Sequence, residues 1–134
     1  MAMIQPGALP RWRARRVVEC IEEHLDERIT ITSLARECGL SSSHFSRAFK
    51  ATFGVTVHLY VMQRRVQIAR ALILRTSDPL SEIAIRCGLS DQAHLTRWFR
   101  RVVGVTPAVW RRTHSEITSA RESSGPEARS DLLA

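Results

Sequence analysis

Two stretches of this chain, residues 34–56 and 83–106, repeat one pattern. The first reads LARECGLSSSHFSRAFKATFGVT and the second reads IAIRCGLSDQAHLTRWFRRVVGVT, so both contain Cys-Gly-Leu-Ser, then His, Arg and Phe, then Gly-Val-Thr. The pattern is offset by 49 residues at Leu40 and Leu89 but by 50 at Phe49 and Phe99, so the second copy has one extra residue in its turn. Each copy predicts a helix, a tight glycine turn and a second helix. The repetition of this motif restricts the chain to a fold with two equivalent units.

The second helix of each copy has an apolar face at helical spacing. We expect the core to receive Leu95, Trp98, Phe99 and Val102 from the second copy, and Phe45, Ala48, Phe49 and Thr52 from the first. Ser41 and Ser90 stand where a helix N-cap is needed. Cys38 and Cys87 precede the turn glycines, where a small thiol packs between two helices.

Apolar spacing predicts helices outside the repeat too, and strand signals are nearly absent. A first helix over residues 11–27 would bury Val17, Val18, Ile21 and Leu25. A helix from residue 57 to about 74, roughly 27 Å long, would bury Leu59, Met62, Val66, Ala69 and Ile73. Pro79 ends it, and Pro107 begins the last helix.

These patterns predict an all-α fold of about seven helices, with two helix-turn-helix units joined by a long linker helix. The expected organisation is a flexible N-terminus over residues 1–10, one domain over 11–113 that contains both units, and a disordered tail over 114–134. Within the domain we expect the first unit over 11–56, the linker helix over 57–75 and the second unit over 79–113.

The charge of the chain indicates a polyanionic partner. There are 20 basic and 13 acidic residues, for a net charge of +7, and every basic residue other than Lys50 is arginine. The faces opposite the predicted core hold Ser43, Ser46, Arg47 and Lys50 in the first copy, and Ala93, His94, Arg97, Arg100 and Arg101 in the second. Such donors on a helix suit the DNA major groove, which recurs about every 34 Å along one side of the duplex. One chain is therefore expected to occupy two successive grooves of an asymmetric site.

An enzyme is the competing interpretation, with Ser41, Ser43 and His44 beside Cys38, or Ser90, Asp91 and His94 beside Cys87. No acid is placed to orient either histidine, so we predict no catalytic site. The three cysteines form no C-x-x-C pair, so we predict no metal site or other cofactor, and reduced thiols in a cytoplasmic protein. No apolar run is long enough to span a membrane. A basic module that binds RNA or a protein remains an alternative.

The chain resembles the DNA-binding domain of the AraC/XylS transcriptional regulators over about residues 11–112. The resemblance rests on ITSLARECGLSSSHFSRAFKATFGVT, on RVQIARALI in the linker helix and above all on IAIRCGLSDQAHLTRWFRRVVGVTPAVWR. It implies two helix-turn-helix units that bind adjacent major grooves of double-stranded DNA, usually to activate transcription through contact with RNA polymerase. By position, the implied base-reading residues are Ser42, Ser43, Ser46 and Arg47, and Gln92, Ala93, His94, Thr96 and Arg97. The implied phosphate contacts are Lys50, Arg100 and Arg101.

Most members of this family carry a further effector-binding or dimerisation domain, and this sequence shows none. We therefore predict no small-molecule effector for this chain and control through its abundance. Met1 and the complete helical set favour a natural single-domain regulator. The alternative is the DNA-binding half of a larger, effector-responsive regulator.

Overall fold

The computed structural model describes the backbone of residues 7–124 and the side chains of residues 7–115. This part of the chain consists of seven helices without a strand, which confirms the predicted all-α fold. The helices are α1 (Arg11–Glu23), α2 (Ile31–Glu37), α3 (Ser42–Phe53), α4 (Val57–Arg75), α5 (Leu80–Arg86), α6 (Gln92–Val103) and α7 (Pro107–Ser124). None of them is long and apolar enough to cross a membrane.

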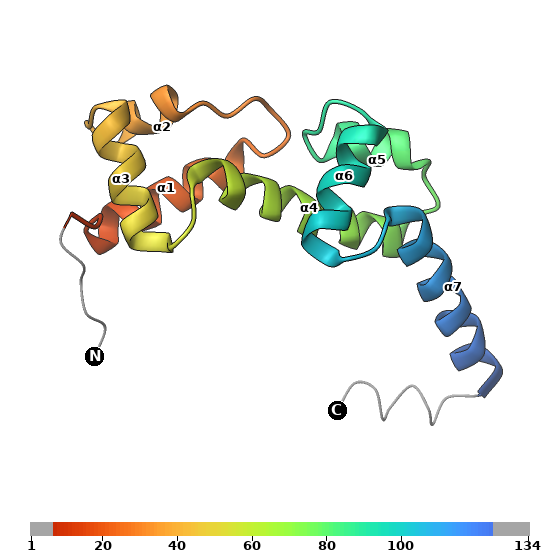
Figure 1. Cartoon of the computed structure of the whole chain (residues 1–134). Helices are drawn as coiled ribbons and strands as arrows, with labels where there is room; N and C mark the ends of the chain where they lie inside the picture. The colour runs from red at the N-terminus through yellow and green to blue at the C-terminus, as the bar shows by residue number, and fades with distance from the viewer. Residues whose placement is uncertain (1–6, 125–134) are drawn as a thin grey trace.

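The long helix α4 joins two units, one formed by α1–α3 and the other by α5–α7 (Figure 1). Each unit has its own core. The first core includes Val17, Ile21, Leu34, Phe45 and Phe49 and receives Val57 and Val61 from α4. The second core includes Ile83, Leu95, Trp98, Phe99 and Trp110 and receives Met62, Val66, Ala69 and Ile73 from α4. The predicted linker helix is thus a structural part of both cores.

The two units repeat the same packing around the second helix of the motif. Phe49 of α3 meets Tyr60 of α4 with ring centroids 5.6 Å apart, and Phe99 of α6 meets Trp110 of α7 at 5.7 Å. Both are edge-on contacts, the arrangement that the ring quadrupoles favour. The sequence repeat therefore corresponds to a repeat of tertiary contacts.

The turns of both units also agree with the sequence interpretation. Cys38 and Cys87 are buried in the two cores, as predicted. Gly39 and Gly88 follow them with φ of 67° and 84°, in the left-handed region that glycine enters without steric cost. In the first unit, Ser41 caps α3 by accepting a hydrogen bond from the His44 amide at 3.2 Å, which confirms the predicted cap.

The predicted cap of the second unit is wrong. Asp91, not Ser90, is the N-cap of α6, and its carboxylate accepts from the His94 amide at 2.8 Å. The extra residue of the second copy lies between Leu89 and the helix, so the position three residues before His94 falls on Asp91. Ser90 instead contacts the ring of His94.

The apolar face of α6 also differs from the prediction at its end. Leu95, Trp98 and Phe99 are buried, but Val102 is 36% exposed. Val103, four residues after Phe99, packs on the second core in its place. The last turn of α6 extends past the second core. In this turn Val103, which lies four residues after Phe99 on the same face of the helix, still contacts the core.

The boundaries of the first helix and of both termini need correction as well. Helix α1 ends at Glu23 rather than near residue 27. Directly after this end, the ring of His24 hydrogen-bonds the Cys20 carbonyl at 2.8 Å. Leu9 is buried, and its amide donates to Thr52 Oγ1 at 2.8 Å, so the predicted flexible N-terminus is wrong at this residue. Residues 1–6 lie outside the described part.

Helix α7 continues to Ser124, so the disordered tail predicted from residue 114 is wrong for residues 114–124. The sequence contains no glycine or proline between Pro107 and Gly125, so nothing breaks the helix before that point. Residues 125–134 lie outside the described residues.

These packing differences predict how two substitutions in α6 compare. Trp98→Ala should lower the free energy of unfolding by about 3–5 kcal/mol, because it opens a cavity in the second core. Val102→Ala should lower it by less than about 1 kcal/mol, because this side chain keeps much of its contact with water. Chemical denaturation monitored by circular dichroism measures both values. Similar losses for the two variants would mean that the buried face of α6 is assigned incorrectly.

Candidate nucleic-acid interface

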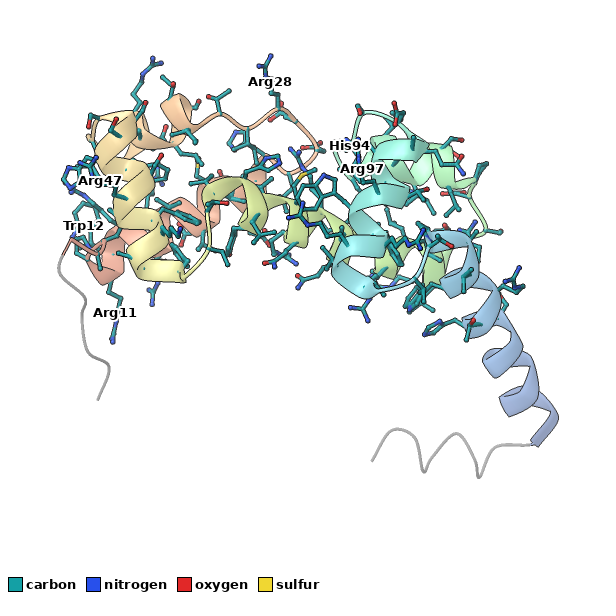
Figure 2. All side chains as sticks on the ribbon, viewed as in Figure 1. Arg11, Trp12, Arg28, Arg47, His94 and Arg97 are labelled. Carbon is teal, nitrogen blue, oxygen red and sulfur yellow. The ribbon has the colours of Figure 1, made fainter. Side chains whose placement is uncertain are left out.

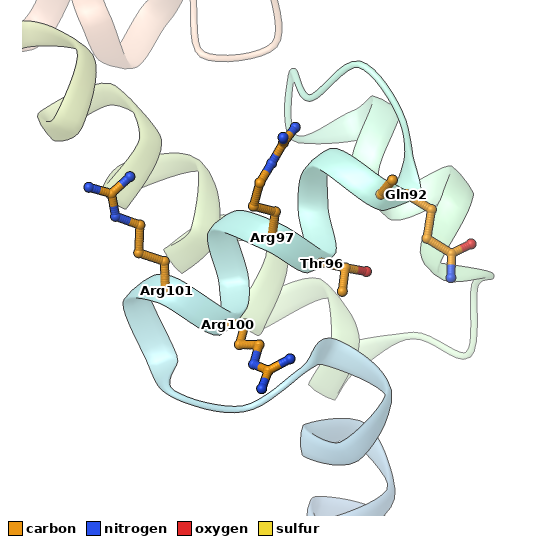
Figure 3. Close-up of a pocket in the computed structure, with 6 residues that line it drawn as sticks. Gln92, Thr96, Arg97, Arg100 and Arg101 are labelled. Atoms are coloured by element: carbon orange, nitrogen blue, oxygen red, sulfur yellow. The ribbon is translucent and has the colours of Figure 1, made fainter.

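One face of α6 carries a stripe of long polar and small side chains, all of them exposed apart from the half-buried Thr96. It consists of two rows with four-residue spacing, Gln92, Thr96 and Arg100 in one and Ala93, Arg97 and Arg101 in the other. These six residues line a shallow surface hollow (Figure 3). The stripe lies on the side of α6 opposite Leu95 and Phe99, which are fully buried. All six residues were predicted as DNA contacts, and the structure brings them together on one surface.

Helix α3 has the equivalent stripe at an offset of 50 residues. Its members are Ser42, Ser43, Ser46, Arg47 and Lys50, of which Ser46 is half-buried and the others are exposed. Figure 2 shows Arg47 directed outward from α3 and Arg97 directed outward from α6. Both units therefore present the same helical face, but the first carries short hydroxyls where the second carries longer or larger side chains.

His94 is also a predicted base-reading residue, but it lies beside the hollow and is half-buried. Its Nδ1 accepts a hydrogen bond from the Ser90 amide at 3.2 Å and pairs with the Ser90 hydroxyl at 3.1 Å. This geometry assigns the ring proton to Nε2. Burial, followed by the positive charge of Arg97, lowers the pKa of His94, so the ring is neutral at physiological pH. It can act on a ligand only as a single Nε2–H donor.

Arg101 is held in place by an aromatic contact. Its guanidinium carbon lies 5.0 Å from the centroid of the Trp98 ring, a cation–π geometry. On the α4 side, Trp98 meets the His58 ring at 5.5 Å in a near-perpendicular arrangement. The contact places the guanidinium of Arg101 against the Trp98 ring at the end of the stripe, while the residue stays exposed.

Several of the residues considered for catalysis, among them Ser41, Cys87 and Asp91, have structural roles. Burial raises the pKa of Cys87 to about 11, so this thiol is protonated and not nucleophilic near neutral pH. The Asp91 carboxylate caps α6. The contact between Ser90 and His94 has two parts of a triad, but no carboxylate among the described residues is hydrogen-bonded to the other ring nitrogen of His94. The described residues also contain no group of three side chains suited to hold a metal ion.

Sequence reasoning missed one buried charge. Arg65 lies on α4 with 8% of its surface exposed, and it hydrogen-bonds two carbonyls of the loop between α1 and α2. An arginine counts as a surface residue in a search for apolar periodicity. The signal that could have revealed it is its position directly before Val66, on the part of α4 that both units cover.

The fold consists of two similar helix-turn-helix units that share α4, and each unit presents a polar stripe on its second helix. These features define a bipartite helix-turn-helix protein. Residues 11–113 match the family described as "Helix-turn-helix domain". Together with the sequence motifs and the similar proteins described next, this match shows that the chain belongs to the AraC/XylS family of helix-turn-helix proteins.

Known proteins similar to this chain support the assignment. The protein named "Probable transcriptional regulator LumQ" from Photobacterium leiognathi is 38% identical over 87 residues, which are 65% of this chain and 35% of LumQ. An AraC-type regulator from Chromobacterium violaceum has a solved structure with a TM-score of 0.70 and 26% identity, over 75% of this chain and 90% of that one. The DNA-binding domain of AdpA, solved in complex with a target DNA, has a TM-score of 0.73 and 29% identity, over 84% of this chain and 98% of that one.

The curated relatives are longer proteins. This chain spans 35% of LumQ and 45% of AdaA from Bacillus subtilis, whose name describes a transcriptional activator that is also a DNA repair enzyme. The matched part is the helix-turn-helix region, so the similarity concerns this region and not the rest of those proteins.

Proposed function

We propose that this chain is a sequence-specific transcription regulator that binds double-stranded DNA by inserting α3 and α6 into adjacent major grooves. The observation that carries the proposal is the equivalent exposed stripe on the second helix of both units. Helices present side chains to base edges in the major groove, and basic side chains at their ends neutralise phosphates. The solved complex of the similar AdpA domain with a target DNA supports double-stranded DNA as the ligand.

The roles follow from position along each stripe. Arg47 and Arg97 are central and exposed, and they are proposed to donate to base edges together with Ser42, Ser43, Ser46, Gln92, Thr96 and the His94 Nε2–H. Ala93 would contact a base edge through its methyl group. Lys50, Arg100 and Arg101 lie toward the C-terminal ends of the stripes and are proposed to contact phosphates. The family resemblance extends the proposal to a transcriptional activator that contacts RNA polymerase. The proposal also keeps the sequence-based predictions of a cytoplasmic location and of no small-molecule effector on this chain.

Selection of binding sites from random duplexes tests the proposal. The expected result is an asymmetric site with two unlike halves whose centres are about one helical turn, roughly 10–10.5 base pairs, apart. An enzyme or an RNA-binding module would give no enriched duplex. Equally strong competition by RNA at moderate salt would identify an RNA-binding module. A palindromic site would contradict the binding of one chain to two successive grooves.

Arg97→Ala should weaken binding to the selected site by about 1–3 kcal/mol and relax selectivity at one base pair, as loss of a bidentate arginine–guanine contact does. The measurement is the dissociation constant on duplexes that carry each of the four base pairs at every position. Arg97→Lys is the matched control, because it keeps the charge but loses the forked donor geometry. Equal weakening on all sequences would show that Arg97 contacts phosphate instead.

Arg101→Ala should weaken binding to all duplexes about equally and reduce the slope of log K against log salt by about one unit, because one phosphate contact is lost. Titrations over a series of salt concentrations give this slope. Arg101→Lys keeps the charge and should keep the slope. A change in base preference with an unchanged slope would contradict the proposed phosphate contact.

A further inference from the structure

The two units touch directly at a place outside α4. The loop between α1 and α2 lies beside the turn between α5 and α6 in Figure 1. A Cβ atom built on Gly88 would be 2.1 Å from the Leu25 carbonyl oxygen, so the backbone of the second unit's turn is in contact with the backbone of the first unit's loop. No side chain fits at this position, because the obstacle is backbone rather than the end of a flexible side chain.

Arg65 holds this contact from α4. Its Nε donates to the Leu25 carbonyl at 3.0 Å, and its Nη2 donates to the Glu27 carbonyl at 2.6 Å. The same Nε lies 3.0 Å from where a Cβ on Gly88 would stand. Arg65 is therefore wedged between the loop of the first unit and the turn of the second. We call the contact of Leu25, Arg65 and Gly88 the inter-unit joint.

The corresponding turn of the first unit makes no such contact. Gly39 occupies the same place in the repeat as Gly88 and has a similar left-handed backbone, with φ of 67° against 84°. A Cβ on Gly39 would have nothing within 4 Å. The left-handed glycine is thus required by the turn in both units, whereas the tight approach to a carbonyl occurs only at Gly88. This difference separates a local role in the turn from a role between the units.

We propose that the inter-unit joint fixes the orientation of α3 relative to α6 and thereby sets the distance that this protein requires between its two DNA half-sites. The inference rests on the proposed function, because it concerns how two recognition helices share one duplex. Each added base pair moves the second half-site by about 3.4 Å and rotates it by roughly 35° about the DNA axis. A rigid joint cannot follow that movement, whereas two units connected by α4 alone can adjust by bending or local rotation. Arg65 acts here as a positioning residue, since it is buried and faces the loop.

The experiment uses duplexes that keep both selected half-sites and change only the number of base pairs between them by one. Fluorescence anisotropy gives the dissociation constant of the full chain for each duplex. For the wild-type chain, altered spacing should weaken binding about tenfold, which corresponds to loss of at least one base contact. We call this loss of affinity at altered spacing the spacing penalty. For Gly88→Ala and Arg65→Met it should fall to about two- or threefold, because the two units can then reorient relative to each other.

Gly39→Ala is the matched control, because it places the same strain in the equivalent turn without a clash between units. It should weaken the fold but keep the tenfold spacing penalty. Arg65→Lys retains a donor that reaches one carbonyl and should give an intermediate penalty. Thermal melting of each variant shows which are folded, and if Gly88→Ala does not fold, the two Arg65 variants carry the test.

Folded joint variants with an unchanged spacing penalty would overturn the inference and leave the proposed function intact. An equal loss of the penalty in Gly39→Ala would overturn it too, because the effect would then come from general destabilisation. A wild-type chain that binds the selected site at every spacing with equal affinity would also refute a rigid joint. Failure of the wild-type chain to select any duplex would refute the proposed function itself.

Discussion

The structure depends on one constraint, which is that a single helix, α4, contributes apolar side chains to two separate cores. Val57 and Val61 of α4 face the first core, and Met62, Val66, Ala69 and Ile73 face the second. Val61 and Met62 are consecutive, and consecutive residues of a helix point about 100° apart. The two units are therefore placed at different heights on α4 and on different sides of it. Packing of apolar side chains against α4 determines where along this helix each unit lies, and the inter-unit joint is proposed to fix the orientation of one unit relative to the other.

Two loops beside α4 have carbonyl groups whose hydrogen bonds come from arginine side chains. The loop after α1 must pass from the first unit toward the second without a regular partner for its carbonyls, and Arg65 supplies the donors. On the other side, Arg111 of α7 donates to the Asp78 carbonyl at 2.7 Å and the Thr76 carbonyl at 3.3 Å, in the loop after α4. Buried carbonyls without partners are costly, so both loops have an arginine from the next long helix.

The elements with strong periodicity could be predicted from the sequence, as could the two turns. The repeat located both turns and both exposed stripes, because glycine turns and apolar spacing are local properties of the chain. Three features could not be predicted this way. The N-cap of α6 is Asp91 rather than the predicted Ser90, because one inserted residue changes which side chain reaches the His94 amide. Val102 became exposed because the core ends before the helix does. Arg65 is buried because of carbonyls 38 and 40 residues away, which no local pattern contains.

The side chains of the α3 stripe are shorter than those of the α6 stripe, and this difference affects which helix can contact base edges in the proposed complex with DNA. In the first unit, Ser42, Ser43 and Ser46 have short side chains, and a hydroxyl reaches a base edge only where the helix backbone lies close to it. In the second unit, Gln92 and Arg97 can span a larger gap. If α4 and the inter-unit joint together hold both helices, the depth at which α3 enters its groove is not free to adjust independently of α6. Under the proposed function, base discrimination would come mainly from α6 and Arg47, while the rest of α3 would contribute fit to the groove and a phosphate contact through Lys50.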